Sequence, residues 1–131
     1  MILAVTSAWV EYLHATGSRV HLRLRGLIAG EGELVTTEVV MMELLAGATT
    51  PEGVTQLRRL LGRFRVLPIE GLADYEAAAE LYRRCRARGE TVRKLTDCLI
   101  AAVAMRSGAT ALHRDHGFDV IARHTSLRVG S

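Results

Sequence analysis

Three carboxylates of this chain stand among apolar residues, where they could do chemistry. Glu43 lies within the apolar segment EVVMMELLAGA, Asp97 near the start of the run LTDCLIAAVAM, and Asp115 just after the apolar string at 109–112. Burying a carboxylate is costly unless it is paired or binds a metal. Converging carboxylates without cysteine or histidine partners favour a hard cation such as Mg²⁺ or Mn²⁺. Such an ion lowers the pKa of a bound water and stabilises charge on a phosphate, as metal nucleases require.

Each of these carboxylates also has a purely structural interpretation. Asp97 could simply be favoured by the dipole at the start of a helix. Glu43 could reach solvent or pair with an arginine, and Asp115 could cap the turn after a strand. We favour a shared site because all three alternatives would have to hold at once.

The elements that must position these residues alternate between strands and helices. Short apolar runs predict strands at 1–5, 33–36, 65–69, 109–112 and 126–129. Periodic patterns with start and stop signals predict helices at 8–16, 18–29, 38–48, 51–61, 72–88, 95–107 and 119–123. Thr6 and Ser7 are candidate caps of the first helix, Thr37 caps the third, and Pro68 indicates an edge or terminal strand position.

Strands that alternate with helices predict an α/β fold with right-handed crossovers. We expect a three-layer α/β/α sandwich around a central, mainly parallel sheet of four to five strands. Open sheets of this type bind ligands beyond the carboxyl ends of their strands. Asp97 and Asp115 are therefore expected at that edge.

Composition indicates one globular domain spanning residues 1–131. The chain is 49% hydrophobic and 24% charged, and no uncharged run approaches the ~20 residues of a membrane span. We see no signal peptide and expect a cytoplasmic protein in which Cys85 and Cys98 stay reduced.

The net charge of +3 comes from arginines and a single lysine, Lys94. This excess fits phosphate binding, but equally a solvated arginine-rich surface of the kind a GC-rich genome encodes.

Three stretches resemble the PIN-domain family, specifically VapC-type toxin ribonucleases of bacterial toxin–antitoxin pairs. They read ILAVTSAWVEYL, TTEVVMMELLAGA and LTDCLIAAVAMRSGATALHRDHGFDVIA, and they cover nearly the whole chain in the family's order. The resemblance implies an α/β/α sandwich, divalent-metal-dependent (Mg²⁺ or Mn²⁺) cleavage of RNA phosphodiester bonds, a homodimer and a VapB-like antitoxin partner. Substrates in the family are often structured RNAs, notably tRNA.

The resemblance also implies roles for individual residues. The family's catalytic, metal-binding acids match Glu43, Asp97 and Asp115. Further candidate ligands are the Thr6 hydroxyl and Asp119. Gly117 stands where the family often has another acid, and the candidates for holding RNA phosphates beside the metal are Arg93, Lys94 and Arg114.

The chain departs from the family at Val5, where the pattern has an aspartate directly before Thr-Ser. Valine offers no oxygen to a metal, and even the loss of residues that only support metal ligands commonly costs about 10–100-fold in affinity or activity. Valine also relieves repulsion among clustered carboxylates, so we expect a stable protein with impaired catalysis. Either the natural protein is a degenerate toxin, or Val5 is an acquired or engineered inactivating change.

The main alternative is a catalytically inactive PIN domain that binds its antitoxin or RNA. A phosphoryl-transfer receiver or small-molecule domain is disfavoured, because the first strand is followed by neither an acid nor a glycine-rich loop.

The remaining residues that suggest function have ordinary explanations. Trp9 and Tyr12 fit core or antitoxin-facing packing better than base stacking, and no metal-ligand spacing is found among His113, His116 and His124.

Overall fold

The computed structural model describes residues 1–131 and contains one five-stranded parallel sheet. The strand order is β3-β2-β1-β4-β5, and all four pairings are parallel. The parallel α/β fold predicted from the sequence is therefore confirmed. The strands are β1 (Ile2–Ala4), β2 (Leu34–Thr37), β3 (Arg65–Leu67), β4 (Thr110–Leu112) and β5 (Val129–Gly130).

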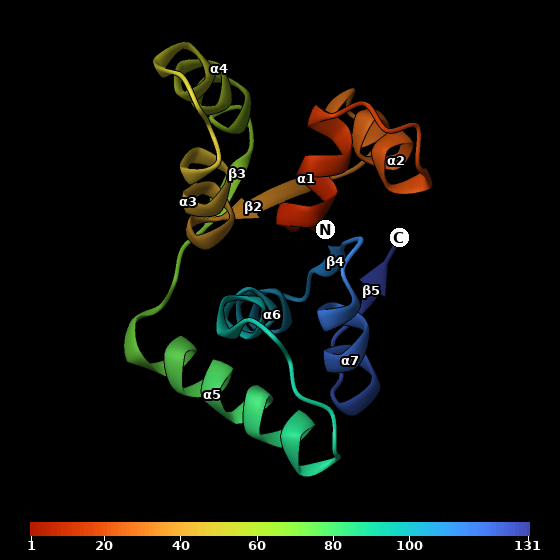
Figure 1. The fold of residues 1–131 in the computed structure, drawn as a ribbon, viewed down its shortest axis with the longest axis vertical. Coiled ribbons are helices and arrows are strands. Elements are labelled where there is room, and N and C mark those ends of the chain that lie inside the picture. Colours follow the sequence, from red (N-terminus) through yellow and green to blue (C-terminus); the bar gives the residue numbers. More distant parts are fainter.

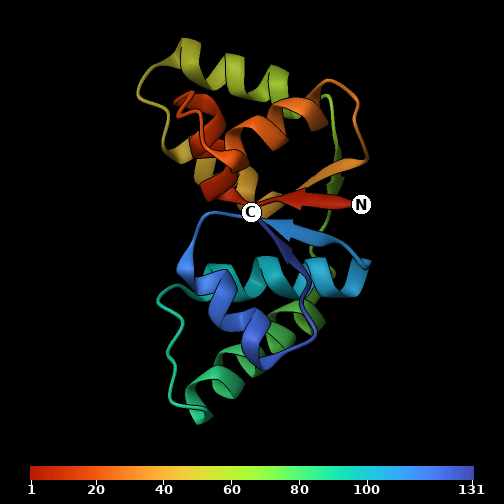
Figure 2. The ribbon, with the colours of Figure 1, turned by 90° about the vertical axis from the view of Figure 1, so that its right-hand side faces the viewer.

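Seven helices cover the two faces of this sheet (Figure 1). Figure 2 shows the first four on one face and the last three on the other, which confirms the three-layer arrangement. No helix is both long and apolar enough to cross a membrane. The helices are α1 (Thr6–Leu13), α2 (Arg19–Ile28), α3 (Glu38–Ala46), α4 (Pro51–Leu61), α5 (Gly71–Ala87), α6 (Leu95–Ser107) and α7 (His116–His124).

Helix α6 is the most deeply buried helix, because it lies between the sheet and α5 (Figure 1). Its residues from Asp97 to Ala104 are all buried, which accounts for the nearly continuous apolar sequence around Asp97. The adjacent strands β1 and β4 contribute Leu3, Ala4, Ala111 and Leu112, all with no exposed surface. Core packing thus fixes both elements that carry the candidate acids Asp97 and Asp115.

Several predicted start and stop signals are confirmed, but that of α1 was wrong. The Thr37 hydroxyl accepts the Val40 N–H at 3.2 Å, and Gly108 ends α6 with φ of 70°. Helix α1 begins at Thr6 with Val5 in the N-cap position, and no side chain caps it. The hydroxyl of Thr6 instead donates to a Glu43 carboxylate oxygen, so it is used between elements.

The other differences from the predictions lie at element boundaries. Strand β3 is an edge strand as predicted, but it ends at Leu67, so Pro68 lies just outside it. The last strand was predicted at 126–129 but consists of Val129–Gly130. Helix α7 begins at His116, three residues before the predicted start, because Asp115 caps it. Helix α3 is not buried all round, since Met42 is 57% exposed.

A partly buried ion pair joins α5 to the end of α6. The guanidinium of Arg106 donates to both carboxylate oxygens of Asp74 at 3.0 Å and to the Pro68 carbonyl oxygen at 2.8 Å. It also pairs with Glu70 at 3.0 Å. Asp74 is buried, and hydrogen bonding to Arg106 lowers the pKa of its carboxyl.

Replacing Arg106 should therefore leave the buried carboxylate of Asp74 without its partner. We expect Arg106→Met to lower the free energy of unfolding by about 2 kcal/mol at pH 7, less than for a fully enclosed pair because the guanidinium is partly exposed. Because the pKa of Asp74 is depressed in the fold, this loss should be present above pH 4 and shrink as the carboxyl is protonated in more acidic solution. Urea unfolding at pH 7 and pH 3 measures it.

The matched control is Arg84→Met, which breaks the exposed Arg84–Glu80 pair. It should cost no more than about 0.5 kcal/mol. Equal losses in the two variants would contradict a special role for the Arg106 pair.

Candidate active site

The carboxyl ends of β1 and β4 meet where the chain reverses its direction along the sheet. Strands β2 and β3 lie on one side of β1, and β4 and β5 lie on the other. Val5 directly follows β1, and its N–H donates to the Leu112 carbonyl oxygen of β4 at 3.0 Å. Open α/β sheets bind their ligands at such a switch point.

Asp97 and Asp115 both open onto this point. Together with Val5 they line a cavity of about 310 Å³, and without Val5 they also line a neighbouring cavity of about 410 Å³. Asp97 comes from the first turn of α6, and Asp115 lies between β4 and α7. The structure therefore brings together two of the three acids that the sequence singled out, from segments far apart in the chain.

Gly117 lets these two carboxylates approach each other. A β-carbon added at Gly117 would lie 3.0 Å from Oδ2 of Asp97 and 3.4 Å from Oδ1 of Asp115. The two oxygens are therefore no farther apart than the sum of these distances. Sequence reasoning noted Gly117 only as a missing acid, whereas its lack of a side chain leaves room between the carboxylates.

The environment of Asp97 strongly disfavours its charge. Its side chain is buried, and its carboxyl has a pKa raised from 3.8 to about 6. Burial and the charge of Asp115 raise this pKa most, Lys94 lowers it to a smaller extent, and Glu43 adds the weakest effect, which raises it. Burial is the largest of these causes. A buried carboxylate whose pKa is raised by like charges is a typical feature of functional sites.

Glu43 reaches the site from α3 and is held by two hydroxyl groups. Thr6 donates to one of its carboxylate oxygens at 2.6 Å, and Thr96 approaches the other at 3.5 Å. Glu43 is half-buried and has no arginine partner, so the ion-pair interpretation was wrong. The sequence analysis did not identify Thr96 as a residue of the site. Its position directly before Asp97 could have indicated this role.

Asp115 caps α7, as its structural interpretation predicted, and it also lines the cavity. Its Oδ1 accepts the Gly117 N–H at 2.9 Å, and its own N–H donates to Nδ1 of His113 at 3.0 Å. The proton of the buried His113 ring therefore lies on Nε2, which is 3.3 Å from Oδ1 of Asp119. Burial lowers the pKa of His113, in keeping with a neutral ring that orders this turn. Asp119 is thus mainly a partner of His113.

Val5 fills the remaining corner of the site with an apolar side chain. It is 1% exposed and lines the smaller cavity beside Asp97 and Asp115. No three His, Cys, Asp or Glu side chains lie close enough together to hold a metal ion. The oxygens of Asp97, Asp115 and Glu43 suit a hard divalent cation chemically, but they form an incomplete set of ligands.

Basic side chains lie at the rims of both cavities. Arg93 and Lys94 line the larger one and are exposed, without ion-pair partners. Arg114 lines the smaller one, but it pairs with Glu11 at 2.9 Å. Trp9 is fully buried, which confirms its interpretation as a core residue.

Comparison with known proteins identifies what this arrangement is similar to. A model of the PIN domain matches residues 2–124. The chain is 47% identical to "Ribonuclease VapC11" of Mycobacterium tuberculosis and to "VapC ribonuclease Mb1587" of Mycobacterium bovis, in both cases over 100% of this chain and 98% of the relative. Among solved structures, VapBC2 from Rickettsia felis bound to a DNA fragment from its promoter superposes with a TM-score of 0.77 at 19% identity, over 99% of this chain and 98% of the other.

Because the pKa of Asp97 is raised in the fold, the stability of the protein should depend on pH. Ionising Asp97 should destabilise the fold above pH 6, and the penalty should fade as the pH drops toward 4, where the carboxyl is protonated in both states. We expect Asp97→Asn to raise the free energy of unfolding by about 2–3 kcal/mol at pH 8, and by much less at pH 4. Urea unfolding in EDTA measures this difference.

The half-exposed Asp119 provides the control, because Asp119→Asn changes the same chemical group nearby. It should show no comparable gain. A loss of stability in Asp97→Asn at pH 8 would contradict the strain that we assign to the buried carboxylate.

Proposed function

The chain belongs to the PIN domain family, and from this we propose that it is a VapC-type toxin ribonuclease that cleaves RNA phosphodiester bonds with a divalent cation. The observation that carries the proposal is the pair of carboxylates at the switch point, where Asp97 has a pKa of about 6. Full-length similarity to ribonucleases supports RNA as the substrate. We further propose that the target is a structured RNA such as tRNA.

We propose Mg²⁺ or Mn²⁺ as the cofactor, held by Asp97, Asp115 and Glu43. When bound, the ion would lower the pKa of a water molecule and neutralise charge that develops on the scissile phosphate. Thr6 and Thr96 would then hold the carboxylate of Glu43 in place through the hydrogen bonds of their hydroxyl groups. The Thr6 hydroxyl and Asp119 remain secondary candidates for ligands.

The basic residues at the rim would position the substrate. Arg93 and Lys94 are exposed beside Asp97 and are free to bind phosphates on either side of the scissile bond. Arg114 can join them only by exchanging its Glu11 partner for a phosphate. Phosphate contacts of this kind orient a nucleic acid without reading its sequence.

Val5 favours a second candidate function for this particular chain. With valine in place of the family's aspartate, the set of ligands is incomplete, and we propose that cleavage is impaired. An inactive PIN domain could still bind an antitoxin or RNA. Complexes such as VapBC2 among the similar structures support a VapB-like antitoxin as the partner. We also propose a homodimer that acts in the cytoplasm.

Restoring the missing carboxylate tests the proposal. Val5→Asp should increase cleavage of a folded tRNA transcript at least 10-fold in Mg²⁺ or Mn²⁺, and EDTA should abolish the gain. Gel analysis of end-labelled RNA measures the rate. Val5→Asn is the matched control, because asparagine has the size of aspartate but no charge. This variant should cleave RNA as slowly as the parent chain.

Two results would count against the nuclease. One is the absence of cleavage by Val5→Asp on tRNA, rRNA and mRNA fragments alike. The other is equal activation by Val5→Asp and Val5→Asn. Either would leave the binding function as the better description.

Metal binding can be tested without RNA. Calorimetric titration with Mn²⁺ should give at least 10-fold tighter binding to Val5→Asp than to the parent chain, because one carboxylate is added to the set. Adding Asp97→Asn to the Val5→Asp protein should remove the gain. If Asp97→Asn has no effect on the titration, the ion does not bind where we propose.

A further inference from the structure

The positive charge of this chain is concentrated in one short segment. Residues 83–94, which we call the basic segment, contain six of the 17 basic residues and one of the 14 acidic residues. The rest of the chain has 11 basic and 13 acidic residues, so the whole net charge of +3 arises in this segment. The cations are Arg83, Arg84, Arg86, Arg88, Arg93 and Lys94.

The fold connects this segment to the candidate active site. It comprises the last turn of α5 and the loop that leads into α6, and the loop ends at Arg93 and Lys94 on the rim of the larger cavity. Figure 2 shows the end of α5 and the start of α6 on the side to which the carboxyl ends of β1 and β4 point. The chain therefore leads from the end of α5 along this loop directly to the rim of the candidate site.

The loop is held in place, and its only acid is neutralised. Val92 is buried in the core, and Glu90 pairs with Arg123 and His124 of α7. Hydrogen bonds from these two residues lower the pKa of Glu90 to about 2. The basic segment is thus anchored to the body of the protein, and Glu90 does not oppose the binding of an anion.

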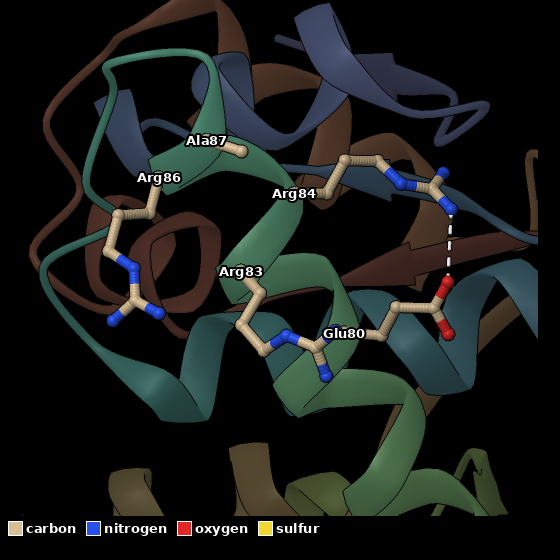
Figure 3. Close-up of a pocket in the computed structure, with 5 residues that line it drawn as sticks. All are labelled: Glu80, Arg83, Arg84, Arg86 and Ala87. Atoms are coloured by element: carbon tan, nitrogen blue, oxygen red, sulfur yellow. Dashed lines mark hydrogen bonds and ion pairs between the residues drawn. The ribbon is translucent and has the colours of Figure 1, made fainter.

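The guanidinium groups at the end of α5 are mostly free. Only Arg84 has a partner, Glu80 at 3.1 Å, as Figure 3 shows, while Arg83, Arg86 and Arg88 make no ion pair. Arg83 and Arg86 border an open hollow of about 520 Å³. Arg86 stacks on the Tyr82 ring at 5.5 Å, which leaves the N–H groups at the edge of its plane free to donate.

Stabilising the helix explains only part of this cluster. Cations near a helix carboxyl end interact favourably with its dipole, typically by about 0.3–1 kcal/mol each, and Arg84 and Arg86 stand in the last turn of α5. This effect does not extend to Arg93, which lies in the loop. Four unpaired arginines that continue toward the site require another explanation.

We propose that the basic segment is a second RNA-binding site, which holds the sugar-phosphate backbone of the substrate away from the bond that is cut. This inference rests on the proposed ribonuclease function. Arg83, Arg86 and Arg88 bind phosphates through their charge and through bidentate hydrogen bonds, and these contacts do not depend on the base sequence of the RNA. The strand then passes Arg93 and Lys94 to reach Asp97 and Asp115.

An acidic protein partner is the competing ligand, and the position of the segment favours RNA. The arginines are continuous with the rim of the site where the scissile phosphate must bind. They lie at a helix end and in the loop that follows it, and this loop ends at the cavity lined by Asp97 and Asp115. No exposed large apolar side chain lies within residues 83–94, whereas protein interfaces usually have aromatic or aliphatic anchors.

The test is RNA binding by the full chain in EDTA, with a fluorescein-labelled RNA hairpin as the probe and anisotropy as the readout. The variant is Arg83→Ala/Arg86→Ala/Arg88→Ala. Each arginine that neutralises one phosphate contributes roughly 0.7–0.9 to the slope of log K, the association constant, against log [KCl]. Loss of three such contacts should therefore make the slope shallower by about 2–3. Kd at fixed salt should rise at least about 10-fold.

The matched control is Arg58→Ala/Arg59→Ala/Arg63→Ala at the end of α4. These arginines are also exposed and free of ion pairs, and Arg63 stacks on Phe64 at 5.5 Å, as Arg86 does on Tyr82. Helix α4 lies at the opposite end of the molecule from α5 (Figure 1). The control removes the same charge and should leave the slope and Kd almost unchanged.

Three outcomes would overturn the proposal. The first is unchanged RNA binding by the α5 variant, and the second is an equal loss in both variants, which would reflect net charge alone. The third is loss of binding to a polyglutamate peptide while hairpin binding is retained, which would assign the segment to an acidic protein.

The two proposals can fail separately. If Val5→Asp cleaves RNA but the α5 variant binds the hairpin normally, the second site is wrong and the nuclease stands. If Val5→Asp cleaves nothing while the α5 arginines still carry hairpin binding, the nuclease is wrong and the RNA-binding surface stands.

Discussion

The constraint on which this structure depends is the burial of a carboxylate among like charges. Asp97 is buried in the best-packed helix of the protein, and Asp115 and Glu43 both oppose its ionisation. Packing alone would favour an apolar residue there, because an uncompensated buried charge weakens a fold. The surrounding structure therefore has to be stable enough to hold it. A continuous core through α6, β1 and β4 and the Arg106–Asp74 pair at the far end of α6 supply that stability.

Val5 bears directly on this balance. At the end of β1 it lies against Asp97 and Asp115, where a further carboxylate would add to the repulsion. The valine carries no charge and presents apolar surface to the cavity. Stability and metal affinity should thus move in opposite directions at this position. Such a trade-off is common where function requires a strained arrangement.

The sequence was sufficient for most of the architecture, and the reasons can be traced to particular residues. The apolar runs of β1 and β4 and the capping signals at Thr37 and Gly108 predicted the order of strands and helices, because burial and capping are local consequences of residue type. It could not reveal that Thr6 would bind Glu43 rather than cap α1, since that choice depends on a residue 37 positions away. The contribution of Gly117 was hidden for the same reason. Its effect is the space that it leaves between two carboxylates from different segments.

The distribution of charge links the acidic site to the rest of the surface. A cluster of carboxylates repels RNA, so a nuclease built on one needs positive charge close enough to hold the backbone and far enough away not to neutralise the ligands. Lys94 illustrates the limit, because it already lowers the pKa of Asp97 to some extent. Further cations beside Asp97, in addition to Arg93 and Lys94, would weaken the binding of a metal ion by the carboxylates. The remaining arginines of the basic segment lie at the end of α5, beyond a loop anchored by Val92 and Glu90, and this position separates the two requirements. In the proposed function the two elements would act together, because the end of α5 would attract the RNA strand and the start of α6 would supply a carboxylate for the chemistry.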